Sequence, residues 1–99
     1  MNEDIRYNIF LRSREIEDLI INNEVRRVTL LLLDFDRDFD ASKVYYSEIL
    51  LLCADSKQYE DNRRIGIIDL DRLERDRKSI LLKAFNLIDE IVKYQRSVA

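Results

Sequence analysis

Apolar residues recur at intervals of three and four along most of the chain, which is the spacing of one face of an α-helix. The pattern is clearest over residues 70–94, and weaker versions of it cover residues 4–21, 24–35 and 43–64. Short polar stretches separate these segments, as they do between antiparallel helices. The pattern predicts an all-α fold, a compact antiparallel bundle of four or five helices that forms a single domain over residues 1–99.

Two parts of this pattern leave the local structure open. Ser13 could cap a restart within the first segment, which would divide it into two short helices. Residues 28–33 form an apolar run of strand length, but Leu favours helices and no turn residue bounds the run, so we expect a helix as far as Phe35. Residues 34–42 are polar and predict a loop, with Ser42 as the cap of the next helix.

Few residues of the chain are suited to ending helices, and their positions predict the turns. With one Gly and no Pro, the sequence excludes sandwiches, barrels and doubly wound sheets, which need many tight turns. Asn22 and Asn23 are expected to end the first helix, because Asn tolerates left-handed backbone. Gly66 is expected to end the helix before the last one, and Asp69 to cap the last helix.

The beginning of the last helix combines apolar and charged side chains. Leu73 belongs to its apolar stripe, whereas Arg77 interrupts the stripe. The Arg77 guanidinium either reaches water at the end of a snorkelling stem or pairs, partly buried, with an acid of the preceding helix or turn. We assign Glu74 and Arg77 to holding this turn and the last helix together.

The composition also excludes most catalytic and metal sites. The chain has no His and a single Cys, so it has no Ser-His-Asp triad, no imidazole ligand, no internal disulfide and no thiolate-rich zinc site. Cys53 lies in an apolar run and is expected to be a core residue whose thiol pKa is raised. We therefore predict no catalytic residue, no metal and no cofactor.

Two acidic motifs are similar to known catalytic or metal-binding motifs but lack other features that those sites need. Residues 30–36 and 67–71 place Asp-x-Asp after an apolar run, as haloacid-dehalogenase-like phosphatases do, but that fold needs a parallel sheet of several βα units. Residues 34–40 alternate acids as a calcium loop does. They lack the Gly and the Glu that an EF-hand has at its sixth and twelfth positions, so a solvated acidic loop is expected.

The charge is mixed in sign and divided unevenly. Charged residues make up 37% of the chain, and the net charge is −3. Residues 1–40 hold six basic and ten acidic side chains, whereas residues 41–99 hold eleven and ten. This asymmetry favours contact between the front of one molecule and the back of another. The candidate contact residues are Arg72, Arg75 and Lys78 against Asp36 and Asp38.

Nucleic acid and a membrane are the two other kinds of partner on which the sequence bears. Nucleic acid could bind through residues 63–78, and this is the alternative function, but acids interleave the basic residues there and the net potential is small. No apolar run approaches the roughly 18 residues of a membrane span, and the first four residues are acidic where a signal peptide is basic. We expect a cytoplasmic protein with no membrane partner.

The segment from residue 63 to residue 87 resembles one known family. It reads R-R-I-G-I-I, then L-E-R-D-R, then I-L-L-K-A-F-N-L, and it is similar to the effector-associated domain family, type eleven. Upstream, residues 16–23, 30–33 and 49–52 extend the resemblance to about residues 14–93. Residues 1–13 lie outside it, as an extension or the start of the first helix. The family usually has Gly at the Asn22 and Asn23 turn, and often Asn where Asp76 stands.

The resemblance implies a small noncatalytic helical adaptor of bacterial conflict and defence systems. Domains of this family are attached to effectors or to signalling ATPases and join components through contacts between like domains, a role similar to that of death-fold domains. For this chain it implies a partner that carries a similar helical domain, or a second copy. We expect neither a small molecule nor a nucleic acid as the partner.

Overall fold

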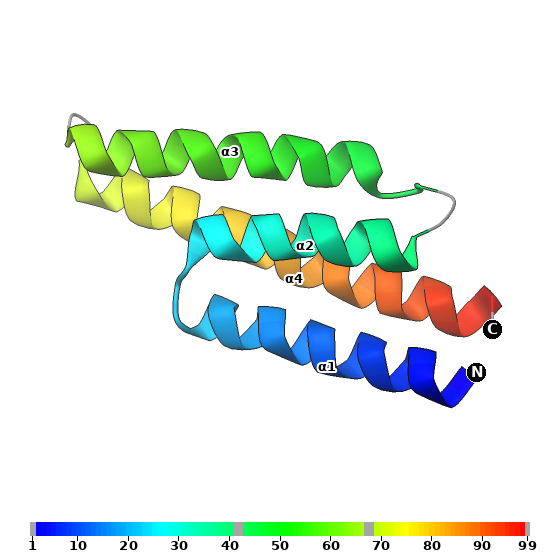
Figure 1. Ribbon diagram of the computed structural model, residues 1–99. Coiled ribbons are helices and arrows are strands. Elements are labelled where there is room, and N and C mark those ends of the chain that lie inside the picture. Colours follow the sequence, from blue (N-terminus) through cyan, green and yellow to red (C-terminus); the bar gives the residue numbers. More distant parts are fainter. Residues whose placement is uncertain (1, 41–42, 67–68, 99) are drawn as a thin grey trace.

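Within residues 2–40, 43–66 and 69–98, which are the residues that the structure describes, the computed structural model contains four α-helices and no strand. The helices are α1 (Asn2–Ile21), α2 (Val25–Phe39), α3 (Tyr46–Ile65) and α4 (Leu70–Val98). They run alternately in opposite directions and form an elongated body of 50 × 24 × 16 Å (Figure 1). The predicted all-α bundle is confirmed, with four helices in place of the four or five expected.

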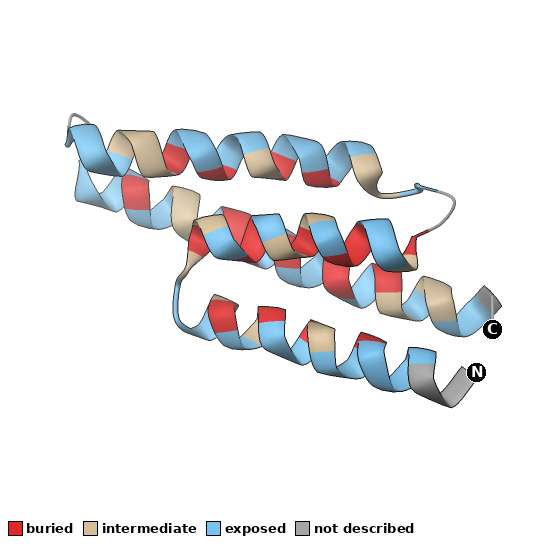
Figure 2. Cartoon of the chain, in the orientation of Figure 1, coloured by how far each residue is buried: buried red, intermediate tan, exposed pale blue. Residues whose placement is uncertain are grey.

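The core lies between helices that pack as a flattened bundle. Helices α2 and α4 each contact the other three helices, whereas α1 and α3 lie on opposite sides of this central pair. Buried side chains face inward on all four helices (Figure 2). The fully covered apolar residues are Val28, Leu32 and Phe35 of α2, Ile49 of α3, and Ala84 and Ile91 of α4.

Helix α1 is continuous through Ser13. The Ser13 hydroxyl donates a hydrogen bond of 3.0 Å to the carbonyl oxygen of Phe10, one turn earlier in the same helix. A serine that bonds back in this way satisfies its hydroxyl without interrupting the helix. The alternative of two short helices with a cap at Ser13 is therefore wrong.

The first turn forms where the two asparagines predicted it. Asn23 has a positive φ of 59°, its N–H donates to the carbonyl of Ile20 at 3.0 Å, and the N–H of Glu24 donates to the carbonyl of Leu19 at 3.0 Å. This pair of bonds is the Schellman arrangement, in which a left-handed residue closes a helix. Asn23 performs the role that Gly usually has.

The α3–α4 turn is also as predicted. Gly66 has a φ of 74° and its N–H donates to the carbonyl of Asn62 at 3.0 Å. Asp69 caps α4, because its Oδ1 accepts the backbone N–H of Arg72 at 2.8 Å. The predicted cap at Ser42 lies outside the described residues.

The acidic segment after residue 33 is helical, so the predicted loop over residues 34–42 is wrong for most of its length. Helix α2 continues to Phe39, and α3 begins at Tyr46 and not near Lys43. The reason is the pair Phe35 and Phe39, which lie one turn apart with ring centroids 5.1 Å from each other. Phe35 is completely buried and Phe39 is partly buried against the core, and packing both rings on one side of α2 requires a continuous helix.

Helix α4 buries most of its predicted stripe but leaves two members exposed. Leu73 is buried, whereas Leu70 is 82% exposed and Phe85 is 46% exposed. The α3–α4 hairpin extends beyond the ends of α1 and α2 (Figure 1), and no described residue between Tyr59 and Leu73 is buried. Leu70 lies in this extension, where no third helix covers it.

A small polar network joins α2 to α3 inside the bundle. The hydroxyls of Thr29 and Ser56 lie 2.7 Å apart, and both residues are fully buried. Arg26 donates to the Ser56 hydroxyl at 3.0 Å and to the carbonyl oxygen of Cys53 at 2.9 Å. The Cys53 thiol donates to the carbonyl of Thr29, and partial burial raises its pKa, as expected.

Candidate functional site

The residues predicted for protein contacts lie at two separate places along the long axis. Arg72, Arg75 and Lys78 occupy the first turns of α4, and Asp36 and Asp38 occupy the last turn of α2. Because α2 and α4 run in the same direction (Figure 1), these two groups are not brought together within one molecule. We call them the basic end and the acidic end.

At the basic end, charged side chains of both signs are left without an ion pair. Lys78 Nζ lies 3.4 Å from Glu74 Oε1, and Arg63 lies 2.9 Å from Glu60. Among the described residues, no acid lies within ion-pair distance of Arg72 or Arg75, and both side chains are exposed. Asp71 and Asp76, their neighbours in the chain, also have no ion pair among the described residues, so Arg72 and Arg75 are exposed cations on a surface of mixed sign.

Glu74 and Arg77 pair with each other and not with a neighbouring element. The Arg77 guanidinium lies 3.5 Å from Glu74 Oε1, one turn earlier in α4. Its Nε atom is buried without a hydrogen-bond partner. The acid that pairs with Arg77 therefore lies in α4 itself, and neither in the preceding helix nor in the turn. The prediction that Glu74 and Arg77 hold the turn to the last helix is corrected, because their contact lies within α4.

Because residues 34–38 are helical, the acids of the acidic end lie on two faces of α2, one outward and one inward. Residues two apart on a helix point to nearly opposite sides, so the outward face carries Asp34 and Asp38. Asp34 lies 3.7 Å from Arg37. Asp38 pairs with Arg12 of α1, whose guanidinium also lies 5.3 Å from the centre of the Phe39 ring. Asp38 remains exposed, so it is accessible to a partner.

The inward face carries Asp36 and Asp40, which are 1% and 2% exposed. Asp40 Oδ2 accepts the backbone N–H of Tyr45 at 3.1 Å and so fixes the start of α3. Asp36 Oδ1 has no hydrogen-bond partner. Burial, followed by the hydrogen bond and the charge of Asp40, raises the pKa of Asp36 to about 7. A buried side chain cannot contact a partner, so the prediction for Asp36 as an interaction residue is corrected.

The described acidic residues are not arranged as the phosphatase motif or a metal site requires. Asp34 is exposed and Asp36 is buried on the other side of the same helix, whereas the phosphatase motif needs both acids at the end of a strand. No three or more His, Cys, Asp or Glu side chains in the described part of the chain are placed to hold a metal ion.

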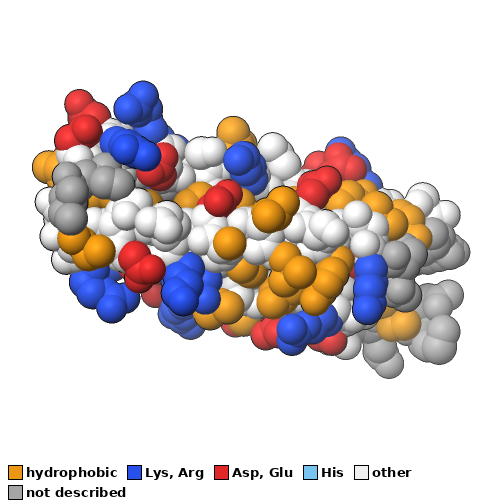
Figure 3. Space-filling model, turned by 90° about the horizontal axis from the view of Figure 1, so that it is seen from above, with side chains coloured by type: hydrophobic (Ala, Val, Ile, Leu, Met, Phe, Trp, Pro, Cys, Tyr) orange, Lys and Arg blue, Asp and Glu red, His pale blue; other side chains and the backbone are white. Residues whose placement is uncertain are grey.

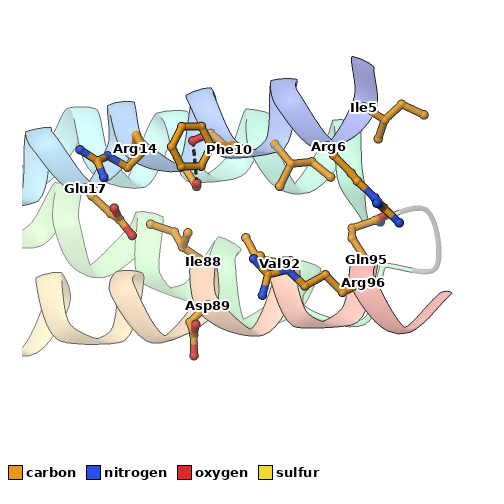
Figure 4. Close-up of a pocket in the computed structure, with 12 residues that line it drawn as sticks. Ile5, Arg6, Phe10, Arg14, Glu17, Ile88, Asp89, Val92, Gln95 and Arg96 are labelled. Atoms are coloured by element: carbon orange, nitrogen blue, oxygen red, sulfur yellow. Dashed lines mark hydrogen bonds between the residues drawn. The ribbon is translucent and has the colours of Figure 1, made fainter. Parts of the chain in front are cut away.

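A groove between α1 and α4 was not predicted from the sequence. It has a volume of about 730 Å³ and an apolar floor that includes Ile9, Phe10, Ile88 and Val92. In Figure 4, Ile88 and Val92 rise from α4 toward α1. Phe10 is 56% exposed. The extra apolar residues of α1 outside its main stripe were the available signal for this groove.

Other exposed apolar side chains are distributed over the surface. Hydrophobic and charged side chains lie next to each other on the face over α3 (Figure 3). The exposed apolar residues include Tyr7, Leu11 and Ile21 of α1, Leu50 and Leu51 of α3, and Leu82 and Phe85 of α4.

The chain was compared with family models, with curated proteins and with solved structures, and nothing matches it. Among the described residues, none of the helices combines the length and the apolar character that a membrane crossing requires.

Proposed function

We propose that this chain is a noncatalytic adaptor domain that associates with like domains. Its partner is a second copy or a protein with a similar helical domain, and the association couples an effector to its partner in a bacterial defence or signalling system. The resemblance of residues 14–93 to the type eleven effector-associated domains supports the biological setting. The placement of the charged ends supports the association.

The observation that carries the proposal is that Arg72 and Arg75 lie at the start of α4, whereas Asp38 lies at the far end of α2, which runs in the same direction. Charges that far apart are screened from each other, since the Debye length is about 8 Å at physiological salt. We infer that Arg72 and Arg75 meet an acidic counterpart on another molecule. A contact between the front of one copy and the back of the next is heterologous, and it builds rows or rings.

Asp38 is the acid best placed to receive such a partner. It is exposed, and a carboxylate that accepts one arginine retains further acceptor sites. An exposed ion pair contributes only about 0–1 kcal/mol. The end-to-end contact therefore needs several pairs, and we expect it to weaken as salt is added.

Charge reversal tests this contact. The variant R75E/K78E makes both ends acidic, and D34K/D38K makes both ends basic, so each alone is expected to lose self-association in sedimentation velocity at low salt. An equimolar mixture of the two is expected to regain it, because every contact then joins opposite charges. Lys57→Glu, an exposed position in the middle of α3, is the matched control and is expected to behave as the unmodified chain.

The proposal fails if R75E/K78E associates as strongly as the unmodified chain, or if the mixture does not associate. Circular dichroism establishes that the variants are folded. Retention of RNA or DNA at physiological salt that is lost in R75E/K78E would favour the nucleic-acid alternative.

A further inference from the structure

The α2–α3 joint is held to the core by two acidic side chains. We define this joint by Asp36 and Asp40 at the end of α2 and by Tyr45, the residue before the first turn of α3. Among the described residues from 36 to 48, Asp36 and Asp40 alone are buried, while Phe39 and Tyr45 are partly buried against the core. Carboxyl groups are rarely buried, because burial removes them from water. The packing of this joint therefore depends on the charge of two carboxyls.

Asp40 connects the two helices through hydrogen bonds of its backbone and its side chain. Its N–H donates to the carbonyl oxygen of Asp36 at 2.8 Å, and its own carbonyl oxygen accepts the N–H of Lys43 at 3.0 Å. Its Oδ2 accepts the N–H of Tyr45 at 3.1 Å. The side chain of Asp36, one turn earlier on the same side of α2, is hydrogen-bonded to that of Asp40. Both sides of the joint are thus held by a residue that contacts a second carboxyl.

The two carboxyls cannot both be ionised while they remain buried in contact. Two carboxyl groups at hydrogen-bond distance share one proton, because like charges repel strongly where water does not screen them. Asp36 Oδ1 receives no hydrogen bond, so a negative charge on Asp36 would be neither hydrated nor hydrogen-bonded at that atom. Burial and the contact with Asp40 raise the pKa of Asp36 for this reason.

Among the described residues, no cation lies within ion-pair distance of Asp36. The other titratable and charged side chains in or beside the joint are Arg12 of α1, Arg37 of α2, Lys43 and Tyr45 before α3, Glu48 of α3 and Glu90 of α4. Arg12 pairs with Asp38 on the outward face of α2, and Arg37 lies 3.7 Å from Asp34. Lys43 Nζ lies 5.6 Å from the centre of the Tyr46 ring. The Tyr45 hydroxyl donates to Glu90 at 3.4 Å.

We propose that the α2–α3 joint is a proton-dependent switch, in which the proton shared by Asp36 and Asp40 keeps the last turn of α2 and the start of α3 packed on the bundle. When the proton passes to solvent, the joint opens and both carboxylates become hydrated. Phe35 and Ile49, which are fully buried on either side of the joint, stay in the core. The opening is therefore local and distinct from unfolding of the whole chain.

Native-state hydrogen exchange of the full chain tests this switch, with each rate divided by the intrinsic rate at the same pH. The amides of Asp40 and Tyr45 are expected to lose protection by about tenfold for each pH unit between about pH 5 and about pH 7, because one proton is released on opening. Low concentrations of urea are expected to leave their protection unchanged, since a local opening exposes little surface. The amide of Leu32, a fully buried core residue, is expected to lose protection as urea is added.

Asp36→Asn can donate a hydrogen bond to Asp40 but has no proton to release, so the protection of the Asp40 and Tyr45 amides is expected not to change with pH in this variant. Asp34→Asn, at an exposed acid of the same helix, is the matched control and is expected to keep the tenfold dependence. The switch is overturned if the protection of the two amides in the unmodified chain is independent of pH, or decreases with urea as steeply as that of Leu32. It is also overturned if Asp36→Asn keeps the pH dependence. If Asp36→Asn does not fold, the pH and urea dependence of the unmodified chain decide.

Discussion

The buried carboxyl pair at the end of α2 predicts that the stability of this chain depends on pH in a particular direction. Asp36 has an ordinary pKa of 3.8, which burial beside Asp40 raises to about 7 in the folded chain. Between these values the folded chain keeps a proton that the unfolded chain has released. The free energy of unfolding contributed by Asp36 therefore falls as the pH rises from about 4 to about 7, and is constant above that.

The size of this effect follows from the same two pKa values. Each pKa unit corresponds to about 1.4 kcal/mol, so the raised pKa of Asp36 lowers the free energy of unfolding by at most about 4 kcal/mol between acid and neutral pH. Asp36→Asn removes the titrating group while its amide can still donate a hydrogen bond to Asp40. The variant and the unmodified chain are expected to be within about 1 kcal/mol of each other near pH 4, and the variant is expected to be more stable by several kcal/mol at pH 8.

The measurement is urea unfolding from pH 4 to pH 8, followed by circular dichroism for the two chains in the same buffers. Titrating groups outside the Asp36–Asp40 pair affect both chains alike, so the difference between the two curves isolates this pair. Asp34→Asn, at an exposed acid on the outward face of the same helix, is the control, and its curve is expected to run parallel to that of the unmodified chain. A difference between Asp36→Asn and the unmodified chain that stays constant with pH would refute the reasoning.

Three further predictions concern the stability of the fold. Thr29→Val removes a hydroxyl that lies 2.7 Å from the Ser56 hydroxyl inside the bundle, and it is expected to lower the free energy of unfolding in urea by about 1–2 kcal/mol. Ser47→Ala, at an exposed position, is the control and is expected to change this free energy little. Gly66→Ala adds a Cβ to a residue with a φ of 74°, and no atom lies within 4 Å of that Cβ. We therefore expect only backbone strain, which lowers the free energy of unfolding by about 1 kcal/mol in thermal unfolding. Asp69→Ala removes the cap of α4 and is expected to cost about 1 kcal/mol, most of which Asp69→Asn should restore.

The sequence predicted the helices and turns well where local chemistry determines them. Gly66, Asn23 and Asp69 each have a conformation or a hydrogen bond that few other residues can provide, so their roles are visible without the tertiary structure. The helical period likewise identified α4. These features depend on residues a few positions apart.

The acidic segment and the groove depend on tertiary contacts and were missed. An alternation of Asp with other residues is polar in composition and indicates a loop, but Phe35 and Phe39 bury one side of it and keep it helical. That burial also takes Asp36 away from the surface. Arg12 of α1 reaches Asp38 from 26 positions away, which no local pattern specifies. The α1–α4 groove results from how two distant helices pack.

The extension of the α3–α4 hairpin beyond the other two helices has a consequence for local unfolding. Since no described residue between Tyr59 and Leu73 is buried, this tip can open without disturbing the core, and its amide hydrogens are expected to exchange with solvent faster than those of the central turns. The basic end lies next to this tip. A partner that covers the tip would oppose this opening, so slower amide exchange at the tip is expected to be an early sign of binding.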